Sequence, residues 1–401
     1  MNTIVQKFGG SSLSSIDKMK TIADRVIRNR KNGFKMVVIV SAMGKTTNNL
    51  IELSNQACNA PSKRELDMLL ATGEQVSASL LTMILKEKGY DSIALTGQQA
   101  GVKTTGIYCN TKIADIDVST VKEYLNKDKI VIIAGFQGVN ERGEVTTLGR
   151  GGSDTTAVAF AAKLGCKCEI YTDVEGIYSV DPRLYSKAQK LDVISYEEMK
   201  EMSQLGAKVM ECRSVEIGHR YKVPIYVASS LSDASGTLIK EWDKQVEERS
   251  VTGLSVTDDV LMVTLKNIPH SSSNVAEVFT LLAEAGVSVD IISQTLPREG
   301  FVNLSFTASA KDYESVKEAM EVIAQKHSSV ELEKDDEIIK LSVVGTGMRT
   351  QSGVAAKLFR VFADNQIEFQ QVTTSEISIS YTLDKAFKQK AVDVAATAFN
   401  L

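Results

Sequence analysis

The sequence contains little cysteine and little histidine, and it has no excess of basic residues. Five cysteines and three histidines occur among 401 residues. The odd number and the spacing of the cysteines do not fit a disulfide framework, so we expect reduced and mostly buried thiols. The histidines lie far apart in the sequence, which argues against a structural metal site.

The charge and the lack of long apolar runs exclude two further classes of protein. A formal net charge of −4 argues against nucleic acid as the main partner. No stretch approaches the roughly 18 apolar residues that cross a bilayer, and no signal-peptide pattern precedes the first expected strand. The sequence therefore predicts a cytoplasmic protein that binds neither nucleic acid nor a membrane.

What is present is a regular alternation of strands and amphipathic helices over residues 1–240. Five apolar segments, several of them rich in β-branched residues, are typical of strands buried on both faces. These segments are 35–43, 91–97, 129–136, 168–174 and 223–230. The alternation predicts an α/β layered domain with a mainly parallel sheet.

A polar and charged stretch marks the end of this domain, and we assign 241–256 as a linker. Beyond it the sequence repeats itself, because the segment that begins at Val278 aligns with the segment that begins at Leu358 with few insertions. The repeat predicts two small α+β modules of βαββαβ order, at 257–335 and 336–401.

The first expected strand carries a lysine beside a glycine-rich loop, in the segment VQKFGGSSL. Gly9 and Gly10 let the backbone approach a ligand closely, and the helix that follows offers free N–H groups to an anion such as phosphate. Lys7 adds a positive charge at the same place. The alternative is an ordinary strand-to-helix turn with a solvated lysine.

The segments VSAMGKTTN and TGEQVSASLL place polar residues at expected helix starts. The first lacks the earlier glycine of a P-loop, because Ile39 stands at that position. It still presents Ser41 and Thr47 to a polar substrate. In the second segment, Glu74 could pair with a substrate ammonium or simply interact with the helix dipole.

The segment TLGRGGSDTTA combines Arg150 with two glycines and a helix start. Arginine offers a planar fork of donors that fits a carboxylate. Asp154 could position a metal or help to orient the lysine. A simple helix cap is the alternative for Ser153 and Asp154.

Another buried strand is expected to end at Thr172, and the loop after it carries further polar residues. Ligands of open α/β sheets bind outside the carboxyl ends of the strands, so Asp173, Tyr178 and Arg183 suit a nucleotide. A normal Asp-Pro turn is the alternative. Together, these segments describe a kinase whose acceptor is an amino acid. The lysine and the glycines would bind phosphates, the arginine a carboxylate and the glutamate an ammonium group.

In their order and spacing, six segments resemble the aspartokinases of the amino-acid-kinase family. They are KFGGSS, VSAMGKTTN, GEQVSASLL, TLGRGGSDTTA, TDVEGIYSVDPR and GAKVM. The repeated modules resemble the pair of ACT domains of these enzymes, which can be interleaved. The resemblance covers essentially the whole chain. It implies transfer of phosphate from ATP, bound with Mg²⁺, to L-aspartate, which is the first step of the lysine, threonine and methionine branch of amino-acid biosynthesis.

The resemblance also implies a role for each matching residue. Lys7 and Asp154 would be catalytic, with magnesium near Asp154 and no protein ligand of the metal assigned. ATP would be bound by Lys7, Gly9, Gly10, Ser11, Thr172, Asp173, Tyr178, Arg183 and Lys208. Aspartate would be bound by Ser41, Thr47, Glu74, Arg150 and Ser153. Glu211 and Cys212 stand where the family commonly has a His-Pro pair, and neither is given a role.

Three other functions fit the sequence less well. A glutamate or acetylglutamate kinase is disfavoured by the repeated tail and by Glu74 after Thr-Gly. A non-catalytic amino-acid sensor would not need Lys7, Arg150 and Asp154 together. A fused homoserine dehydrogenase is not expected, because the sequence ends at Leu401.

The first module is the expected site of feedback inhibition by L-lysine, with threonine as a second candidate. Asp290 aligns with Gln370 of the second module, so only the first copy has a carboxylate at this position. The expected effector site consists of Ser273, Asn274, Val275, Ser288, Val289 and Asp290. The alternative is that Asp290 merely faces water. The modules also predict a homodimer or higher assembly, since the edges of small sheets need covering.

Overall fold

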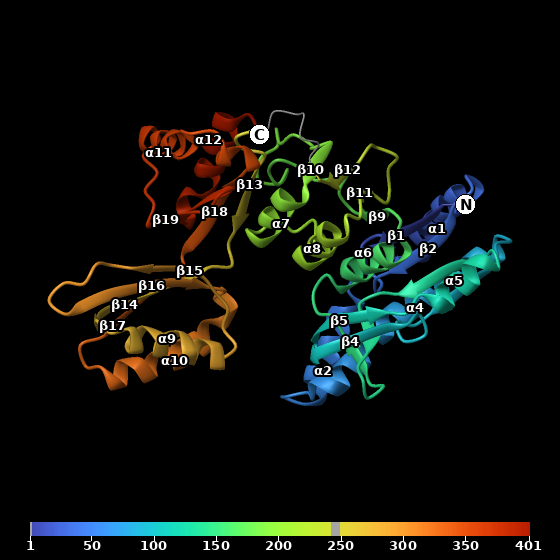
Figure 1. Ribbon diagram of the computed structural model, residues 1–401, viewed down its shortest axis with the longest axis horizontal. Coiled ribbons are helices and arrows are strands. Elements are labelled where there is room, and N and C mark those ends of the chain that lie inside the picture. Colours follow the sequence, from blue (N-terminus) through green and yellow to red (C-terminus); the bar gives the residue numbers. More distant parts are fainter. Residues whose placement is uncertain (1, 242–248) are drawn as a thin grey trace. The chain divides into compact units, whose positions relative to one another are not determined.

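The computed structural model describes residues 2–241 and 249–401, which divide into two compact units (Figure 1). The first unit comprises the residues up to Ser179, Gln189–Gln204 and the segment that begins at Lys208. The second comprises Val180–Ala188, Leu205–Ala207 and the C-terminal segment that ends at Leu401. Two short stretches of the predicted catalytic region therefore pack with the second unit. Residues 242–248 of the predicted linker lie outside the described residues.

An eight-stranded sheet forms the centre of the first unit, in the order β10-β12-β11-β9-β1-β2-β6-β3. Its strands are β1 (Thr3–Phe8), β2 (Lys35–Val40), β3 (Ser92–Leu95), β6 (Ile130–Ala134), β9 (Cys168–Thr172), β10 (Val193–Ser195), β11 (Ile225–Ser229) and β12 (Thr237–Lys240). Each neighbouring pair is parallel except β11 with β12. The predicted α/β domain with a mainly parallel sheet is confirmed.

Helices α1 (Ile16–Lys31), α4 (Thr72–Glu87), α5 (Ser119–Asn126), α6 (Gly152–Leu164) and α7 (Tyr196–Gln204) pack against this sheet. The first unit also contains α2 (Thr46–Ala57), α3 (Lys63–Leu70) and α8 (Cys212–Tyr221). The side chain of Ser15 caps α1 by accepting from the N–H of Lys18, as the sequence predicts. The apolar face of α1 packs with α4 against β1, β2 and β6 in one core.

The stretch Lys63–Glu87, which contains α3 and α4, has the length and hydropathy of a membrane-spanning helix. However, 56% of its most apolar window is buried inside the molecule. A mostly buried core helix meets the same criteria, so this single stretch is weak evidence for a membrane span.

A smaller four-stranded sheet in the first unit is absent from the sequence-based prediction. Its order is β5-β4-β7-β8. Its strands are β4 (Val102–Ile107), β5 (Asn110–Ile116), β7 (Gln137–Val139) and β8 (Val145–Thr147). The chain leaves this sheet at the end of β8 and enters the predicted Arg150 segment, so the sheet helps to position that segment.

The second unit contains two further four-stranded sheets, in the orders β15-β16-β14-β17 and β13-β18-β20-β19. The first module runs through β14 (Leu261–Pro269), α9 (Ser272–Glu284), β15 (Val289–Gln294), β16 (Phe301–Ala308), η1 (Ala310–Asp312), α10 (Tyr313–Lys326) and β17 (Glu331–Asp335). The second runs through β18 (Ile338–Val344), η2 (Thr346–Arg349), α11 (Val354–Asp364), β19 (Gln371–Thr374), β20 (Ser378–Asp384), η3 (Lys385–Phe387) and α12 (Lys388–Phe399). The predicted repeat of two α+β modules is confirmed.

The second module is completed by a strand that precedes the first module in the sequence. This strand, β13 (Gly253–Thr257), pairs antiparallel with β18. In the first module β17 pairs antiparallel with β14, so β13 and β17 hold corresponding positions. Residues 253–256 of the predicted linker are therefore part of a sheet, and the two modules are interleaved in the sequence.

Candidate active site

A hollow of about 540 Å³ lies in the first unit where β1 and β2 end and where α2, α4 and α6 begin. Eight residues that the sequence predicts for the site line it. They are Lys7, Gly10, Ser41, Thr47, Glu74, Arg150, Ser153 and Asp154. Segments as far apart as the first strand and α6 therefore converge on one cavity.

Lys7 forms a nearly buried ion pair with Asp154 inside the hollow. Its strand β1 lies between β2 and β9, with Lys7 opposite Ile39 and Ile170. The ammonium lies 2.5 Å from a carboxylate oxygen of Asp154, and the two side chains are only 10% and 12% exposed. Because little water reaches the pair, its two charges interact more strongly than a surface pair would.

The glycine loop packs so closely on the end of β2 that one of its positions excludes a side chain. A Cβ atom at Gly10 would lie 2.7 Å from the carbonyl oxygen of Ala42. A Cβ atom at Gly9 would lie 3.6 Å from the ammonium nitrogen of Lys7. The backbone of this loop therefore passes directly beside the lysine. Ser11 is exposed and does not line the hollow.

Glu74 is a buried carboxylate with one unused oxygen. It is 3% exposed, and its Oε1 accepts from the N–H of Ala42 at 3.0 Å. Its Oε2 is buried and has no hydrogen-bond partner among the described residues. Burial raises the pKa of Glu74 to about 8, against the opposing effect of its backbone hydrogen bonds. An unused carboxyl oxygen in such a place suits a ligand cation, such as an ammonium group, whose charge would favour the ionised form of Glu74.

The raised pKa of Glu74 predicts that the ligand-free protein loses stability as the pH rises. The folded state keeps the proton up to a pKa of about 8, whereas the unfolded chain releases it near 4.5. The free energy of unfolding should therefore fall between these pH values, by up to roughly 4 kcal/mol. Glu74→Gln should abolish this fall, and Glu87→Gln, at an exposed position of the same helix, should retain it. Denaturant unfolding at pH 5.5 and 8.5 measures the change in the free energy of unfolding for each protein. Equal pH dependence in the wild type, Glu74→Gln and Glu87→Gln would show that Glu74 does not cause the fall.

Arg150 lies in the segment 148–151 between β8 and α6, which we call the Arg150 loop. Gly149 and Gly151 adopt φ values of +76° and +62°, in the region that favours glycine. Arg150 is exposed at the rim of the hollow, and no hydrogen bond or ion pair holds its guanidinium within the described chain. Its planar donors are therefore available to an anionic ligand.

The start of α6 lies next to this loop and offers further donors. Ser153 and Asp154 belong to its first turn, and no side chain caps the helix at Gly151. The free N–H groups of a helix start favour negative charge. The interpretation of Ser153 and Asp154 as simple caps is therefore not supported by their hydrogen bonds.

Of the residues predicted to bind the nucleotide, Lys7 and Gly10 line the hollow, whereas Thr172, Asp173, Tyr178, Arg183 and Lys208 do not. Thr172, at the end of β9, donates to the carboxylate of Asp173 at 3.0 Å. Tyr178 is half-buried, and Lys208 is exposed. Arg183 belongs to the second unit, where it pairs with Asp181 at 2.6 Å. Binding of a nucleotide by these residues stays a prediction.

Glu211, which has no role in the prediction, packs against the Arg150 loop. A Cβ atom at Gly151 would lie 2.4 Å from the Cβ of Glu211. Burial and the nearby charge of Asp154 raise the pKa of Glu211, while Arg213 and Arg150 oppose the shift. Gly151 is thus required both by its backbone conformation and by the side chain packed on it.

The predicted effector residues of the first module lie near the start of α9 and in β15. The helix starts at Ser272, two residues before the predicted position Asn274, and the side chain of Ser271 caps it by accepting from the N–H of Ser273. The side chain of Asp290 is 55% exposed and forms an ion pair with the buried Lys340 of β18. Asp290 therefore does more than face water, because the chain already supplies one ammonium partner.

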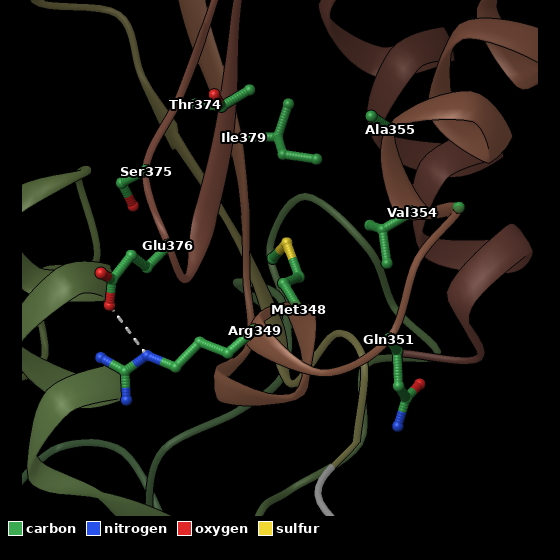
Figure 2. A pocket seen from close by; sticks show the side chains of 10 residues that line it. Met348, Arg349, Gln351, Val354, Ala355, Thr374, Ser375, Glu376 and Ile379 are labelled. Atoms are coloured by element: carbon green, nitrogen blue, oxygen red, sulfur yellow. Dashed lines mark hydrogen bonds and ion pairs between the residues drawn. The ribbon is translucent and has the colours of Figure 1, made fainter.

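The second module contains a hollow of about 600 Å³ at the corresponding helix start (Figure 2). Figure 2 shows Thr374, Ser375 and Glu376 on one side of it and Val354 and Ala355 on the other, with Met348 between them and Arg349 directed toward Glu376. The side chains of Arg349 and Glu376 form an ion pair at 3.2 Å. Helix α11 begins here without a side-chain cap, which distinguishes it from α9.

Comparison with known proteins supplies the family context for this geometry. The family model described as the amino acid kinase family matches residues 2–229, and one described as the ACT domain matches residues 341–399. The chain is 46% identical to the aspartokinase of Geobacillus stearothermophilus and 44% identical to aspartokinase 2 of Bacillus subtilis. Each alignment covers 100% of this chain and 98% of the relative.

A solved structure has a similar fold. Aspartokinase III of E. coli, in complex with aspartate and ADP, has a TM-score of 0.83 at 24% identity, over 100% of both chains. The complex of that enzyme with lysine and aspartate has a TM-score of 0.78. At this identity the likeness shows a shared fold and nothing more.

Proposed function

This chain belongs to the amino acid kinase family and is an ATP-dependent aspartate kinase, and from that premise we propose that the hollow around Lys7 is where the transfer takes place. The γ-phosphoryl group of ATP passes to the side-chain carboxylate of L-aspartate, giving ADP and 4-phospho-L-aspartate. The acceptor carboxylate is already ionised at neutral pH, so no general base is needed. The protein has to hold two anions in line and neutralise their charge.

The arrangement of charges in the hollow is the observation that supports this proposal. The unused oxygen of Glu74 accepts the ammonium group of aspartate, and Arg150 binds its α-carboxylate. The hydroxyls of Ser41, Thr47 and Ser153 hold the rest of the substrate. Lys7, oriented by Asp154, stabilises the phosphoryl group as it moves.

ATP binds beside this hollow with Mg²⁺ on its phosphates. The residues assigned to it are Lys7, Gly9, Gly10, Ser11, Thr172, Asp173, Tyr178, Arg183 and Lys208. Within residues 2–241 and 249–401, no group of three histidine, cysteine, aspartate or glutamate side chains could hold a metal. Asp154 would hold a magnesium ion that arrives with the nucleotide, and the ion would neutralise phosphate charge.

We assign the reaction to the first step of the lysine, threonine and methionine branch of amino-acid biosynthesis, in the cytoplasm. An assay of ADP release with L-aspartate, L-glutamate and N-acetylglutamate tests the substrate. We expect release with aspartate alone. Release with either of the others would favour a different kinase of the family, and no release with any of them would favour an amino-acid sensor.

We also propose that L-lysine inhibits by binding to the first module, with threonine as the alternative effector. The effector site consists of Ser273, Asn274, Val275, Ser288, Val289 and Asp290. Asp290 already pairs with the ammonium of Lys340, so the position accepts the chemical group that lysine would bring. Binding inhibits only if the inactive arrangement binds lysine more tightly than the active one.

Asp290→Asn should require roughly tenfold more lysine for half-inhibition, because a charged hydrogen-bond partner is lost. ADP release measured against lysine concentration gives this value. Glu376→Gln, at the hollow of the second module, should be inhibited like the wild type. The proposed site would be contradicted if lysine inhibited the wild type and Asp290→Asn equally, or if it inhibited neither. If only Glu376→Gln required more lysine for half-inhibition, the effector site would lie in the second module.

The modules should join copies of the chain into a homodimer or a higher assembly. Among the described strands, β15 and β19 each lie at one edge of their sheet, opposite β17 and β13. They expose Ile292, at 55%, and Val372, at 36%, and unpaired edges with apolar side chains favour association. Sedimentation velocity at micromolar concentration should show a dimer or larger species. A monomer with and without lysine would be inconsistent with this assembly.

A further inference from the structure

We propose that Asp67 and Arg213 are positioning residues for aspartate binding, because they fix Thr147 and Leu148 at the base of the Arg150 loop. Neither residue has a role predicted from the sequence. Neither side chain lines the hollow around Lys7, so both act through the loop. The inference rests on the proposed role of Arg150 in binding the substrate.

Asp67 holds the loop base from the side of α3. It is fully buried, at 0% exposure. Its two carboxylate oxygens accept the N–H of Cys109 at 3.1 and 3.0 Å, and Oδ1 also accepts the hydroxyl of Thr147. Cys109 lies at the tip of the β4–β5 hairpin with φ +67°, a conformation that a residue other than glycine adopts only when it is held. The carboxylate thus joins α3, the hairpin tip and the end of β8.

Arg213 holds the same base from α8. One of its terminal nitrogens donates to the carbonyl of Leu148 at 2.7 Å, and the other donates to the carbonyl of Thr111 at 2.9 Å. The hydroxyl of Thr111 in turn donates to the carbonyl of Thr147 at 2.8 Å. A single guanidinium therefore joins α8 to both the hairpin and the loop base.

These bonds leave the loop base with little freedom. The hydroxyl and carbonyl of Thr147 and the carbonyl of Leu148 are all used, and the N–H of Leu148 donates to the carbonyl of Phe136 at 2.9 Å. Arg150 follows two residues later and has no hydrogen bond of its own within the described chain. The position of Arg150 before the substrate binds is therefore set by the loop base and by the start of α6. A donor that is already in position binds the substrate carboxylate at a lower entropic cost.

Steady-state kinetics of Asp67→Asn and Arg213→Lys test the proposal. An asparagine has one acceptor oxygen instead of two, and a lysine cannot reach two carbonyls with a rigid fork. Both variants should raise the KM for aspartate by roughly 10- to 100-fold, with little change in the KM for ATP. Glu198→Gln is the matched control, because Glu198 is equally buried and accepts from the hydroxyl of Ser195 at 2.8 Å. It should change neither KM.

A double-mutant cycle separates positioning from a general structural role. If Asp67 acts by placing Arg150, then Asp67→Asn should add no further rise in the KM for aspartate once Arg150 has been replaced by alanine. Additive effects in the double variant would overturn the proposal. A wild-type KM for aspartate in both Asp67→Asn and Arg213→Lys would also overturn the proposal. Neither result would overturn the proposed function, provided that the wild type turns over aspartate.

Hydrogen exchange provides a readout that does not depend on the substrate. The amides of residues 145–152 should exchange faster in Asp67→Asn and in Arg213→Lys than in the wild type, and at the wild-type rate in Glu198→Gln. Unchanged exchange in the first two variants would overturn the positioning role. A wild-type protein that fails to phosphorylate aspartate would instead overturn the proposed function.

Discussion

Replacing Lys7 by alanine is expected to lower the turnover number about 10³-fold, with little change in the KM for ATP. The ammonium lies beside the glycine loop, 2.5 Å from Asp154. Its charge is needed most when the phosphoryl group moves, so its loss should raise the barrier more than it weakens nucleotide binding. ADP release at saturating substrates measures the effect. Turnover within a few-fold of the wild type would contradict the assigned role.

Stability must be measured beside turnover, because Lys7→Ala leaves the buried carboxylate of Asp154 without its cation. We expect a lower Tm for this reason. The double variant Lys7→Ala/Asp154→Asn removes the buried charge and should recover stability but not turnover. Lys129→Ala serves as a control, since Lys129 pairs with Asp91 at 3.1 Å next to the amino end of β6. It should leave turnover unchanged.

The parallel core of the first unit could be predicted because buried strands of this kind have continuous apolar sequences. The segment KMVVIV of β2 is an example, and five of its six residues are buried. The small sheet of β4, β5, β7 and β8 could not, because β7 and β8 have only three residues each and β4 and β5 are mostly polar. β4, with the sequence VKTTGI, buries only two of its six residues. Its pairing depends on contacts that no local pattern encodes.

The interleaving of the two modules could not be predicted from the sequence for the same physical reason. A strand such as β13 carries no signal for its partner, and its choice of β18 over β14 is made by long-range packing. Repetition in the sequence shows that two similar modules exist. It does not show which strand completes each of them.

The residues around the hollow differ in the same way. The presence of Lys7, Gly10 and Arg150 in one hollow could be predicted, because each lies in a short segment whose residue types suit one chemical task. Asp67 and Arg213 could not, because their role depends on bonds such as the one between Asp67 and Thr147, which are 80 residues apart in the chain. A faint signal exists for Asp67, since an acid next to the apolar face of a helix is costly unless donors satisfy it.

Removing Arg150 or Glu74 should weaken aspartate binding far more than ATP binding. In the proposed aspartate site, Arg150→Ala removes the partner of the α-carboxylate, and Glu74→Gln removes the partner of the ammonium. Loss of one partner of a buried charged pair costs about 2–5 kcal/mol, so the KM for aspartate should rise at least about 30-fold. Steady-state kinetics with each substrate varied in turn measure both constants. A variant that weakened ATP binding alone would refute the assignment of that residue.

The pH dependence of the KM for aspartate should distinguish the two roles. Burial holds the pKa of Glu74 at about 8 in the ligand-free protein, and only the ionised carboxylate can pair with the ammonium of the substrate. The KM of the wild type should therefore fall about tenfold per pH unit as the pH rises from 6 toward 8, and level off above it. Arg150→Ala should keep this slope at a higher KM, because Glu74 still titrates. Glu74→Gln should lose the slope, and a persistent slope in that variant would show that another group controls binding of the ammonium.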